Sequence, residues 1–514
     1  MKYFLTLIQL WVGFLSICAS YPKANIWIIP SVESPQVYRN YAQTSKVHLE
    51  MARGEVEHIQ LVFPSKVNEE YRFTFDRYLK GIQISARELK KMNGYYDALV
   101  PFKNQLKCTD TLTAVWITVQ CPSRVPVGKY HQTIKIEGSK HFTIQLDYNV
   151  HHTTIPLKSS IPITVGVENR CMTECLNDKE ADKERQRWVD FVLSYRMTPV
   201  FGTQITPERW QYEHSFSPWA WNDKRSIRLL NDRRYSCYML PFFTLSENEL
   251  ASLLCNIQKK GKLKESLFYI WDEPAYMEDY EQIKRKVNII RKYASDARIL
   301  TTFFCGPRNG PRKGDLYAVF DYLKHHIHVA TISLAPCKGN EEEVQHIRYK
   351  VPEGIDWWSY VCWQPGGNEP NFLLQMKGIQ QRAIMRRTWK NGSQGFLYWN
   401  CNIYHKRNPF TYITDMPHGD GILIYPGDIL GCKGPIASAR LERWRDGAEE
   451  MELLRLVEKN YSKEKADTLL NIVYSSPLSF IEKAHNIPFF RKELLDQLDK
   501  TIPIDYKLRI TDFI

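Results

Sequence analysis

The chain has 514 residues, so two or three compact domains are expected rather than one. Hydrophobic residues make up 43% and charged residues 25% of it, the composition of a soluble globular protein. The formal net charge of +12 is a mild bias for this length, and no nucleic-acid-binding motif accompanies it, so a nucleic acid is not expected as a partner.

The first predicted element is a secretory signal peptide over residues 1–20. Lys2 precedes an apolar stretch at 4–17, and small residues follow at 18–20. Removal of this segment predicts a secreted protein, with a lysosome-like compartment as the alternative. No later segment approaches the ~20 uninterrupted apolar residues of a membrane helix, so no integral membrane span is expected.

An exported chain is permitted disulfides and glycans. Eleven of its twelve cysteines follow the signal, and an odd number leaves at least one thiol free or paired with another chain. The candidate disulfides are two closely spaced pairs, Cys108 with Cys121 and Cys171 with Cys175. Sequons at 391–393 and 460–462 predict a glycoprotein.

Residues 21–155 are predicted to form an N-terminal β-sandwich domain. Short alternating runs at 58–63, 114–119, 132–136 and 142–146 are typical of half-buried strands. Prolines and glycines separate these runs, as expected for the connections of a sandwich.

Residues 156–432 are predicted to form a (β/α)8-type barrel domain, because strands and helices alternate there. Helices are expected at 181–195, 277–295 and 372–389. The expected strands are 161–165, 199–201, 236–243, 267–271, 299–304, 329–334, 356–361 and 395–399. Residues 433–514 are predicted to form a C-terminal helical cap, with Glu and Arg pairs along a helix at 436–460.

The most informative segment is the strand at 267–271, which ends at Trp271 and is followed by Asp272, Glu273 and Pro274. Acids at the carboxyl end of a barrel strand lie where such barrels build active sites. Proline disfavours a helical conformation for the residue before it, so Glu273 is expected to be extended. Side chains of consecutive extended residues point to opposite sides, so the two acids should serve different atoms of one sugar.

This division of labour favours substrate-assisted glycoside hydrolysis. In that chemistry one carboxyl group protonates the leaving oxygen, while the other orients an acetamide of the substrate that acts as the nucleophile. A neighbouring carboxylate and apolar walls would raise the pKa of the acid, as its role requires. The structural alternative is that Asp272 and Glu273 only cap the helix that follows.

An ordered set of short motifs runs through most of the mature chain. They are Trp271-Asp272-Glu273-Pro274; Trp357-Trp358-Ser359-Tyr360 with Pro365 and Asn371; Arg382, thirteen positions before Gly395-Phe396-Leu397-Tyr398-Trp399; Gly419-Asp420-Gly421; Tyr425-Pro426-Gly427; Gly434-Pro435; Ser438; Arg440-Leu441-Glu442; and Arg445-Asp446-Gly447. In this order the set resembles glycoside hydrolase family 123, whose known enzymes are β-N-acetylgalactosaminidases.

The resemblance implies a retaining mechanism assisted by the 2-acetamido group of a terminal β-linked N-acetylgalactosamine on a glycan or glycolipid. It implies that Asp272 orients the acetamide and that Glu273 is the general acid and then the base. Two positions depart from the family pattern: Arg386 replaces a frequent tryptophan, and a closing Glu-Asp pair is Glu449-Glu450. These departures bear on the substrate more than on the chemistry.

Aromatic and amide side chains near the predicted strand ends are candidates for sugar binding, because aromatic faces stack on sugar C–H surfaces. Tyr360 is the expected hydroxyl partner of the acetamide carbonyl. The candidate substrate-binding residues are Trp271, Trp358, Tyr360, Asn371, Trp399 and Asn402. Asp420 and Arg440 are expected to form a buried structural ion pair.

Two other functions fit the sequence. A glycosidase with an ordinary carboxylate nucleophile, Asp356 or Glu369, would act on a sugar that lacks the acetamide. A non-catalytic carbohydrate-binding protein would keep the barrel and the aromatic side chains. No cofactor is expected, since phosphate-binding loops are absent, and no metal site is expected from the histidines at 325–328. The sequence does not determine the oligomeric state.

Overall fold

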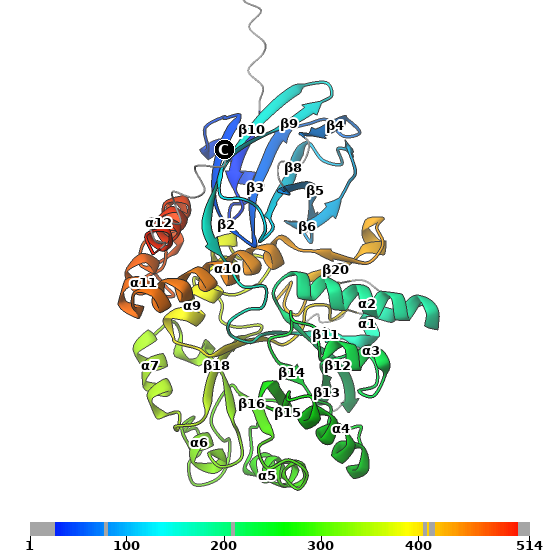
Figure 1. Ribbon diagram of the computed structural model, residues 1–514, viewed down its shortest axis with the longest axis vertical. Coiled ribbons are helices and arrows are strands. Elements are labelled where there is room, and N and C mark those ends of the chain that lie inside the picture. The colour runs from blue at the N-terminus through cyan, green and yellow to red at the C-terminus, as the bar shows by residue number, and fades with distance from the viewer. Residues whose placement is uncertain (1–25, 77–80, 207–210, 405–408, 411–416, 502–514) are drawn as a thin grey trace, which may run out of the picture.

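The computed structural model describes residues 26–76, 81–206, 211–404, 409–410 and 417–501. The predicted signal peptide, residues 1–20, lies outside these residues. The protein is a mixed α/β structure in which a β-rich N-terminal part and a barrel-like sheet lie on either side of helix α10 (Ala439–Asn460) (Figure 1).

The N-terminal part contains two five-stranded sheets whose apolar side chains form one buried core. Residues along β9 and β10 alternate between buried and exposed, as expected for sheets with one face in a core. In sheet order, the first sheet is β1 (Trp27–Pro30), β3 (Glu55–Pro64), β8 (Leu112–Cys121), β5 (Gln83–Met92) and β6 (Tyr95–Pro101). The second is β2 (Lys46–Arg53), β10 (His141–Thr154), β9 (Gly128–Glu137), β4 (Glu70–Phe75) and β7 (Gln105–Lys107).

A nine-stranded sheet curls into a nearly closed barrel in the second half of the chain. Its strands are parallel except β13, which is antiparallel to β12. The Phe216 N–H, just after β13, donates to the Met239 carbonyl of β14 at 2.6 Å and narrows the opening between the sheet ends. In sheet order the strands are β13 (Gln211–Ser215), β12 (Thr198–Thr206), β11 (Ile163–Glu168), β19 (Gly395–Tyr398), β18 (Asp356–Val361), β17 (Val329–Ser333), β16 (Arg298–Phe303), β15 (Ser266–Trp271) and β14 (Tyr238–Met239).

Helices lie around the outside of this sheet, and a further group packs at its junction with the N-terminal sheets (Figure 1). They are α1 (Asn169–Thr173), α2 (Asp178–Ser194), α3 (Lys224–Leu229), α4 (Glu247–Lys259), α5 (Met277–Arg291), α6 (Ala318–Leu323), α7 (Glu341–Lys350), α8 (Gly378–Arg382), α9 (Ile384–Lys390), α10, α11 (Lys463–Leu470) and α12 (Ile487–Asp499). A small ribbon pairs β20 (Ile424–Pro426) with β21 (Pro435–Ala437). None of the helices in the described part of the chain is long and apolar enough to cross a membrane.

Several local expectations differ from the structure. The strand expected at 236–243 is only the two-residue β14, and the strand β13 was not predicted at all. The single helix expected at 372–389 begins only at Gly378 and is divided between α8 and α9. The predicted domain boundaries at 20, 155 and 432 remain predictions.

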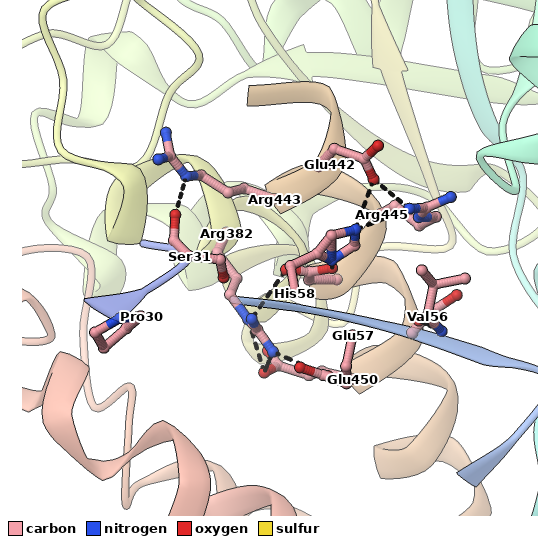
Figure 2. A network of polar contacts seen from close by, with 12 residues as sticks. Pro30, Ser31, Val56, Glu57, His58, Arg382, Glu442, Arg443, Arg445 and Glu450 are labelled. Atoms are coloured by element: carbon pink, nitrogen blue, oxygen red, sulfur yellow. Dashed lines mark hydrogen bonds and ion pairs between the residues drawn. The ribbon is translucent and has the colours of Figure 1, made fainter. Parts of the chain in front are cut away.

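Helix α10 differs from the expected C-terminal cap. It carries the predicted Glu and Arg side chains, yet most of the helix is buried between the two halves of the protein. On one side it contacts β3: His58 Nε2 lies 3.0 Å from Glu442 Oε2 (Figure 2). On the other side it contacts α8, where Arg382 Nη1 lies 3.0 Å from Asp446 Oδ2 and Arg382 Nη2 lies 2.7 Å from Glu450 Oε1.

The charges of this interface are arranged so that buried acids meet buried bases. Burial lowers the pKa of His58 well below its usual value, so the imidazole is neutral at neutral pH even beside Glu442. Against the effect of burial, the charges of Arg445 and Arg87 lower the pKa of Glu442 to about 2. Arg491 of α12 adds a further link, with Nε 2.9 Å from Glu57 Oε1 of β3. Buried charged side chains therefore connect the two halves of the protein, although packed apolar side chains of similar volume are often at least as stabilising.

The structure also bears on the predicted disulfides and glycosylation sites. All eleven cysteines in the described residues are free. Cys108 follows β7 and Cys121 ends β8, which belong to different sheets, while the Cys171 thiol donates to the Tyr404 carbonyl. Neither predicted disulfide is present. Asn391 is fully buried, so its sequon is not accessible in the folded chain, whereas the sequon at 460–462 begins at an exposed residue.

Replacing Arg382 by alanine would leave Asp446 and Glu450 buried without their shared cation. We expect the free energy of unfolding to fall by about 3–5 kcal/mol, measured by urea denaturation. Arg234→Ala is the control, because its side chain is 29% exposed beside Asp190 and Asp232, and its loss should stay within about 1 kcal/mol. Equal losses for the two variants would contradict a structural role for the buried network.

Candidate active site

A cavity of about 240 Å³ opens at the carboxyl-terminal ends of the parallel strands. Side chains of strands on both halves of the barrel-like sheet contribute to its wall, together with the segments that follow the strands. The lining residues are Thr164, Gly166, Val167, Val200, Gly202, Tyr212, His214, Tyr269, Asp272, Glu273, Thr302, Tyr360, Cys362, Trp363, Leu397, Tyr398, Trp399, Asn400 and Asp420. The cavity therefore combines two adjacent acids with a largely aromatic wall.

The backbone at the two acids is not extended as expected. Glu273 has φ +43°, in the left-handed region that residues other than glycine rarely adopt. The register between β15 and β16 also shifts between Tyr269 and Trp271, which interrupts the regular alternation of the strand. Both Asp272 and Glu273 consequently line the same cavity, and both are exposed to it. The expectation that they point to opposite sides is wrong.

Asp272 is fixed by two hydroxyl donors. The Tyr269 hydroxyl donates to Asp272 Oδ1 at 2.6 Å, and the Thr302 hydroxyl donates to the same oxygen at 2.7 Å. Burial and then the Asp272 charge raise the pKa of Tyr269 well above its usual value, so the phenol keeps its proton and remains a donor. These bonds hold the Asp272 carboxyl group in one orientation.

Glu273 has the opposite environment. Burial and then the Asp272 charge raise the pKa of Glu273 to about 7, although the Tyr360 hydroxyl and Arg308 act to lower it. Tyr360 donates to Glu273 Oε1, and the Glu273 backbone N–H donates to Thr302 Oγ1 at 3.0 Å. Thr302 thus touches both acids. The pair contains one held carboxylate and one carboxyl group that can carry a proton near neutral pH.

His214 and Tyr269 line the same cavity as Asp272. Their rings are stacked with centroids 4.3 Å apart. Burial lowers the pKa of His214 to about 4, so this ring is neutral at neutral pH and does not compete as a counter-ion for Asp272. Neither residue was predicted as part of the site, since each lies within a strand, His214 in β13 and Tyr269 in β15, and not in the segment that follows it.

The predicted binding residues divide into two groups. Tyr360 and Trp399 line the cavity, but the Tyr360 hydroxyl is bonded to Glu273. Trp358 is 1% exposed and belongs to the core inside the barrel, where it lies with Leu300 and Val329. It is two residues before Tyr360 on β18, so the same strand face carries one ring into the core and the next into the cavity.

The remaining three candidates lie outside the cavity lining. Trp271 packs on the outer core below Lys286, whose Nζ lies 5.6 Å from the ring centroid. Asn371 is buried and donates to the carbonyls of Cys362 and Pro365 at 2.9 and 2.8 Å. Asn402 accepts a bond from the Glu168 backbone N–H at 2.7 Å. The two asparagines brace loops, and the neighbouring Asn400 lines the cavity instead.

The sequence analysis assigned no binding role to several lining residues: Tyr212, His214, Tyr269, Thr302 and Asp420. Thr302 and Tyr269 could have been found from the position of their strands, because β16 pairs with β15 and each residue lies near a strand end. Among the described residues, no group of three or more His, Cys, Asp and Glu side chains is arranged to hold a metal ion.

Replacing Asp272 by asparagine removes the negative charge that raises the pKa of Glu273. We expect that pKa to fall from about 7 toward 4.5. The pKa is measured by carbon-13 NMR of labelled glutamate carboxyl groups, and the Glu273→Gln variant assigns the signal. Tyr360→Phe should move the pKa upward, because the phenol stabilises the ionised form. Asp356→Asn is the control, since Asp356 lies at the opposite end of β18. A Glu273 pKa unchanged by Asp272→Asn would contradict the proposed interaction.

Comparison with known proteins finds a matching sequence family and a structure with a similar fold. Residues 183–457 match the sequence profile of "Glycoside hydrolase 123, catalytic domain". A family 123 glycoside hydrolase from Clostridium perfringens, studied for glycolipid glycan hydrolysis, has a similar structure with a TM-score of 0.64 and 13% identity, over 95% of this chain and 100% of that one. No curated protein matches.

More distant structures also align. A GH5 xyloglucanase from Bacteroides ovatus aligns over 79% of this chain and 98% of its own, with 10% identity and a TM-score of 0.26. A GH2 beta-galacturonidase from Eisenbergiella tayi aligns over 77% of this chain and 90% of its own, with 9% identity and a TM-score of 0.33.

Proposed function

Because this chain belongs to glycoside hydrolase family 123, we propose that it is a retaining exo-glycoside hydrolase that releases terminal β-linked N-acetylgalactosamine. The substrate's own 2-acetamido group is the nucleophile. The natural substrates are glycans or glycolipids, as suggested by the glycolipid glycan hydrolysis of the Clostridium perfringens relative. The observation that carries the proposal is the pairing of a fixed Asp272 with a Glu273 whose pKa is about 7 in one cavity.

In the first step, protonated Glu273 donates its proton to the glycosidic oxygen as the C1–O bond breaks. The acetamide carbonyl oxygen attacks C1 and forms a cyclic oxazolinium ion. Asp272 accepts a hydrogen bond from the acetamide N–H and stabilises the positive charge that develops there. Since Tyr269 and Thr302 already hold the Asp272 carboxylate in place, little reorganisation is needed during the step.

In the second step, ionised Glu273 takes a proton from water while the water oxygen attacks C1. The C1 bond to the acetamide oxygen breaks, the acetamide is restored, and two inversions leave the original configuration. Tyr360 holds Glu273 Oε1 in both steps, which leaves the other carboxyl oxygen for the proton. A pKa of about 7 allows the same group to act as acid and then as base near neutral pH.

The size of the cavity supports exo action. A volume of about 240 Å³ is below the usual range of about 300–1,000 Å³ for sites that enclose drug-sized ligands, so it suits one sugar ring rather than a chain. We infer that the nine-stranded sheet is a (β/α)8-type barrel with one added antiparallel strand and that the N-terminal sheets form a β-sandwich. Secretion after loss of residues 1–20 is part of the same proposal.

The alternative with an ordinary carboxylate nucleophile is weakened by where its candidates lie. Asp356, at the start of β18, is bound by Arg298 and Gln394. Glu369 is bound by Arg387, with Oε2 2.8 Å from Nη1. Neither residue lines the cavity. A carbohydrate-binding protein without activity would not need an acid with a pKa near 7 beside a fixed carboxylate.

Glu273→Gln removes the proton donor while keeping the shape of the side chain. We expect kcat on an unactivated β-N-acetylgalactosaminide to fall by about 10²- to 10⁴-fold, with a smaller loss on a dinitrophenyl glycoside whose leaving group needs little protonation. Asp356→Asn, an acid outside the cavity, should retain wild-type kcat. Wild-type turnover by Glu273→Gln would refute its role as the acid.

Participation of the acetamide is tested separately. A thiazoline mimic of the cyclic intermediate should bind at least about 100-fold more tightly than N-acetylgalactosamine, and Asp272→Ala should lose most of this advantage. A panel of aryl galactosides, glucosides and N-acetylhexosaminides provides the comparison. Hydrolysis of sugars without the acetamide, together with no thiazoline inhibition, would favour a carboxylate nucleophile. Sugar binding without hydrolysis of any substrate would favour the non-catalytic alternative.

A further inference from the structure

Asp420 is a buried acid on the cavity wall, and one of its carboxyl oxygens has no hydrogen-bond partner in the described part of the chain. It lies between Gly419 and Gly421, whose φ angles of +88° and +67° make a tight loop, and it is 3% exposed. Its Oδ1 accepts bonds from Trp399 Nε1 at 3.0 Å and from the Tyr398 hydroxyl at 3.2 Å. Its Oδ2 has no hydrogen-bond partner among the described residues.

The predicted Asp420–Arg440 ion pair does not account for this acid. Arg440 Nη2 lies 2.9 Å from Asp97 Oδ2 instead, and Arg440 Nη1 donates to the Gly419 carbonyl at 2.7 Å. Arg440 therefore holds the loop through its backbone and has another carboxylate as its counter-ion. The Asp420 side chain is not required for that function. A buried acceptor without a partner is costly and requires an explanation, and a hydroxyl group of a bound ligand would supply one for a residue that lines the cavity.

The position of Asp420 relative to the two catalytic candidates follows from the sheet order. Asp420 is bonded to residues at the end of β19, and Glu273 follows β15, four strands away in the nearly closed sheet. Asp420 thus faces Glu273 across the cavity. Cys362 lies within the influence of both: burial, the Asp420 charge and the Glu273 charge all raise the pKa of its thiol.

We propose that Asp420 Oδ2 accepts a hydrogen bond from the C4 hydroxyl of the bound sugar. The contact selects for sugars that carry this hydroxyl group. The inference rests on the proposed function, which places C1 at Glu273. In a pyranose ring C4 lies opposite C1, so a residue across the cavity from the acid meets the C4 end. A site with a buried polar group rejects a ligand that cannot pair with it, because the group then stays desolvated and unpaired.

The test uses an aryl β-N-acetylgalactosaminide and its 4-deoxy counterpart with wild-type protein and Asp420→Ala. We expect the substitution to lower kcat/KM by about 10- to 100-fold on the parent substrate and to change it little on the 4-deoxy substrate. Wild type should lose a similar factor when the hydroxyl is removed. Equal losses on both substrates would overturn the proposal, as would a pattern that follows the 3-deoxy or 6-deoxy sugar instead.

Asp420→Asn is the second variant, because it keeps the side-chain shape and an oxygen for Trp399 and Tyr398 while replacing the free acceptor by a donor. If thermal unfolding shows that Asp420→Ala does not fold, Asp420→Asn is used in its place to test the contact with the C4 hydroxyl. Asp428→Asn, an exposed acid eight positions further on, is the matched control and should behave as wild type.

A binding measurement separates this inference from the proposed function. If wild type hydrolyses no N-acetylhexosaminide, the proposed function fails, and calorimetry with free N-acetylgalactosamine and its 4-deoxy analogue still tests Asp420. Tighter binding of the parent sugar by wild type, lost in Asp420→Asn, supports the contact. Equal affinities of wild type for the two sugars would overturn it.

Discussion

The candidate active site depends on the burial of one carboxyl group, Glu273, beside a second one, Asp272. Asp272 and Glu273 share one small cavity, so ionising both is unfavourable. Burial and then the Asp272 charge raise the pKa of Glu273 to about 7, while two hydroxyl groups hold one oxygen of Asp272. In the proposed mechanism, the different environments of the two adjacent acids assign one as the proton donor and the other as the charge stabiliser.

This arrangement requires an unusual backbone, and the rest of the fold supports it. A left-handed residue other than glycine persists only where its surroundings hold it. The Glu273 N–H is bonded to Thr302 on the neighbouring strand β16, and its carboxyl group is bonded to Tyr360 on β18. Strands on one side of the turn therefore fix both its main chain and its side chain.

The junction between the two halves of the protein relies on charge in another way. Arg386 and Glu450, the two departures from the family pattern, contact each other, with Arg386 Nε 2.9 Å from Glu450 Oε2. The buried guanidinium group of Arg386 thus has the carboxylate of Glu450 as its counter-ion. This pair lies between α9 and α10, away from the cavity, so these departures concern assembly and leave the proposed sugar site intact.

Most strands of the barrel-like sheet could be predicted from the sequence, because apolar runs of this length bounded by turn residues are typical of buried strands. The sequence located the acid pair for the same reason. It failed at Glu273, where the rule for residues before proline was overridden by contacts with Thr302 and Tyr360 that come from strands far along the chain. It also did not indicate the burial of α10, since solvated and buried ion pairs have the same sequence pattern until their partners on β3 and α8 are known.

The Trp358 indole has a consequence for how this site could change. A Cβ atom on Gly395 would lie 2.2 Å from that ring, so the neighbouring strand carries glycine where the indole needs room. The ring belongs to the core inside the barrel-like sheet, together with Tyr360 and Leu397, and these two residues also line the cavity. The packing next to these lining residues consequently depends on two residues on adjacent strands, Trp358 and Gly395. A smaller side chain at position 358 would remove the contact that keeps position 395 a glycine.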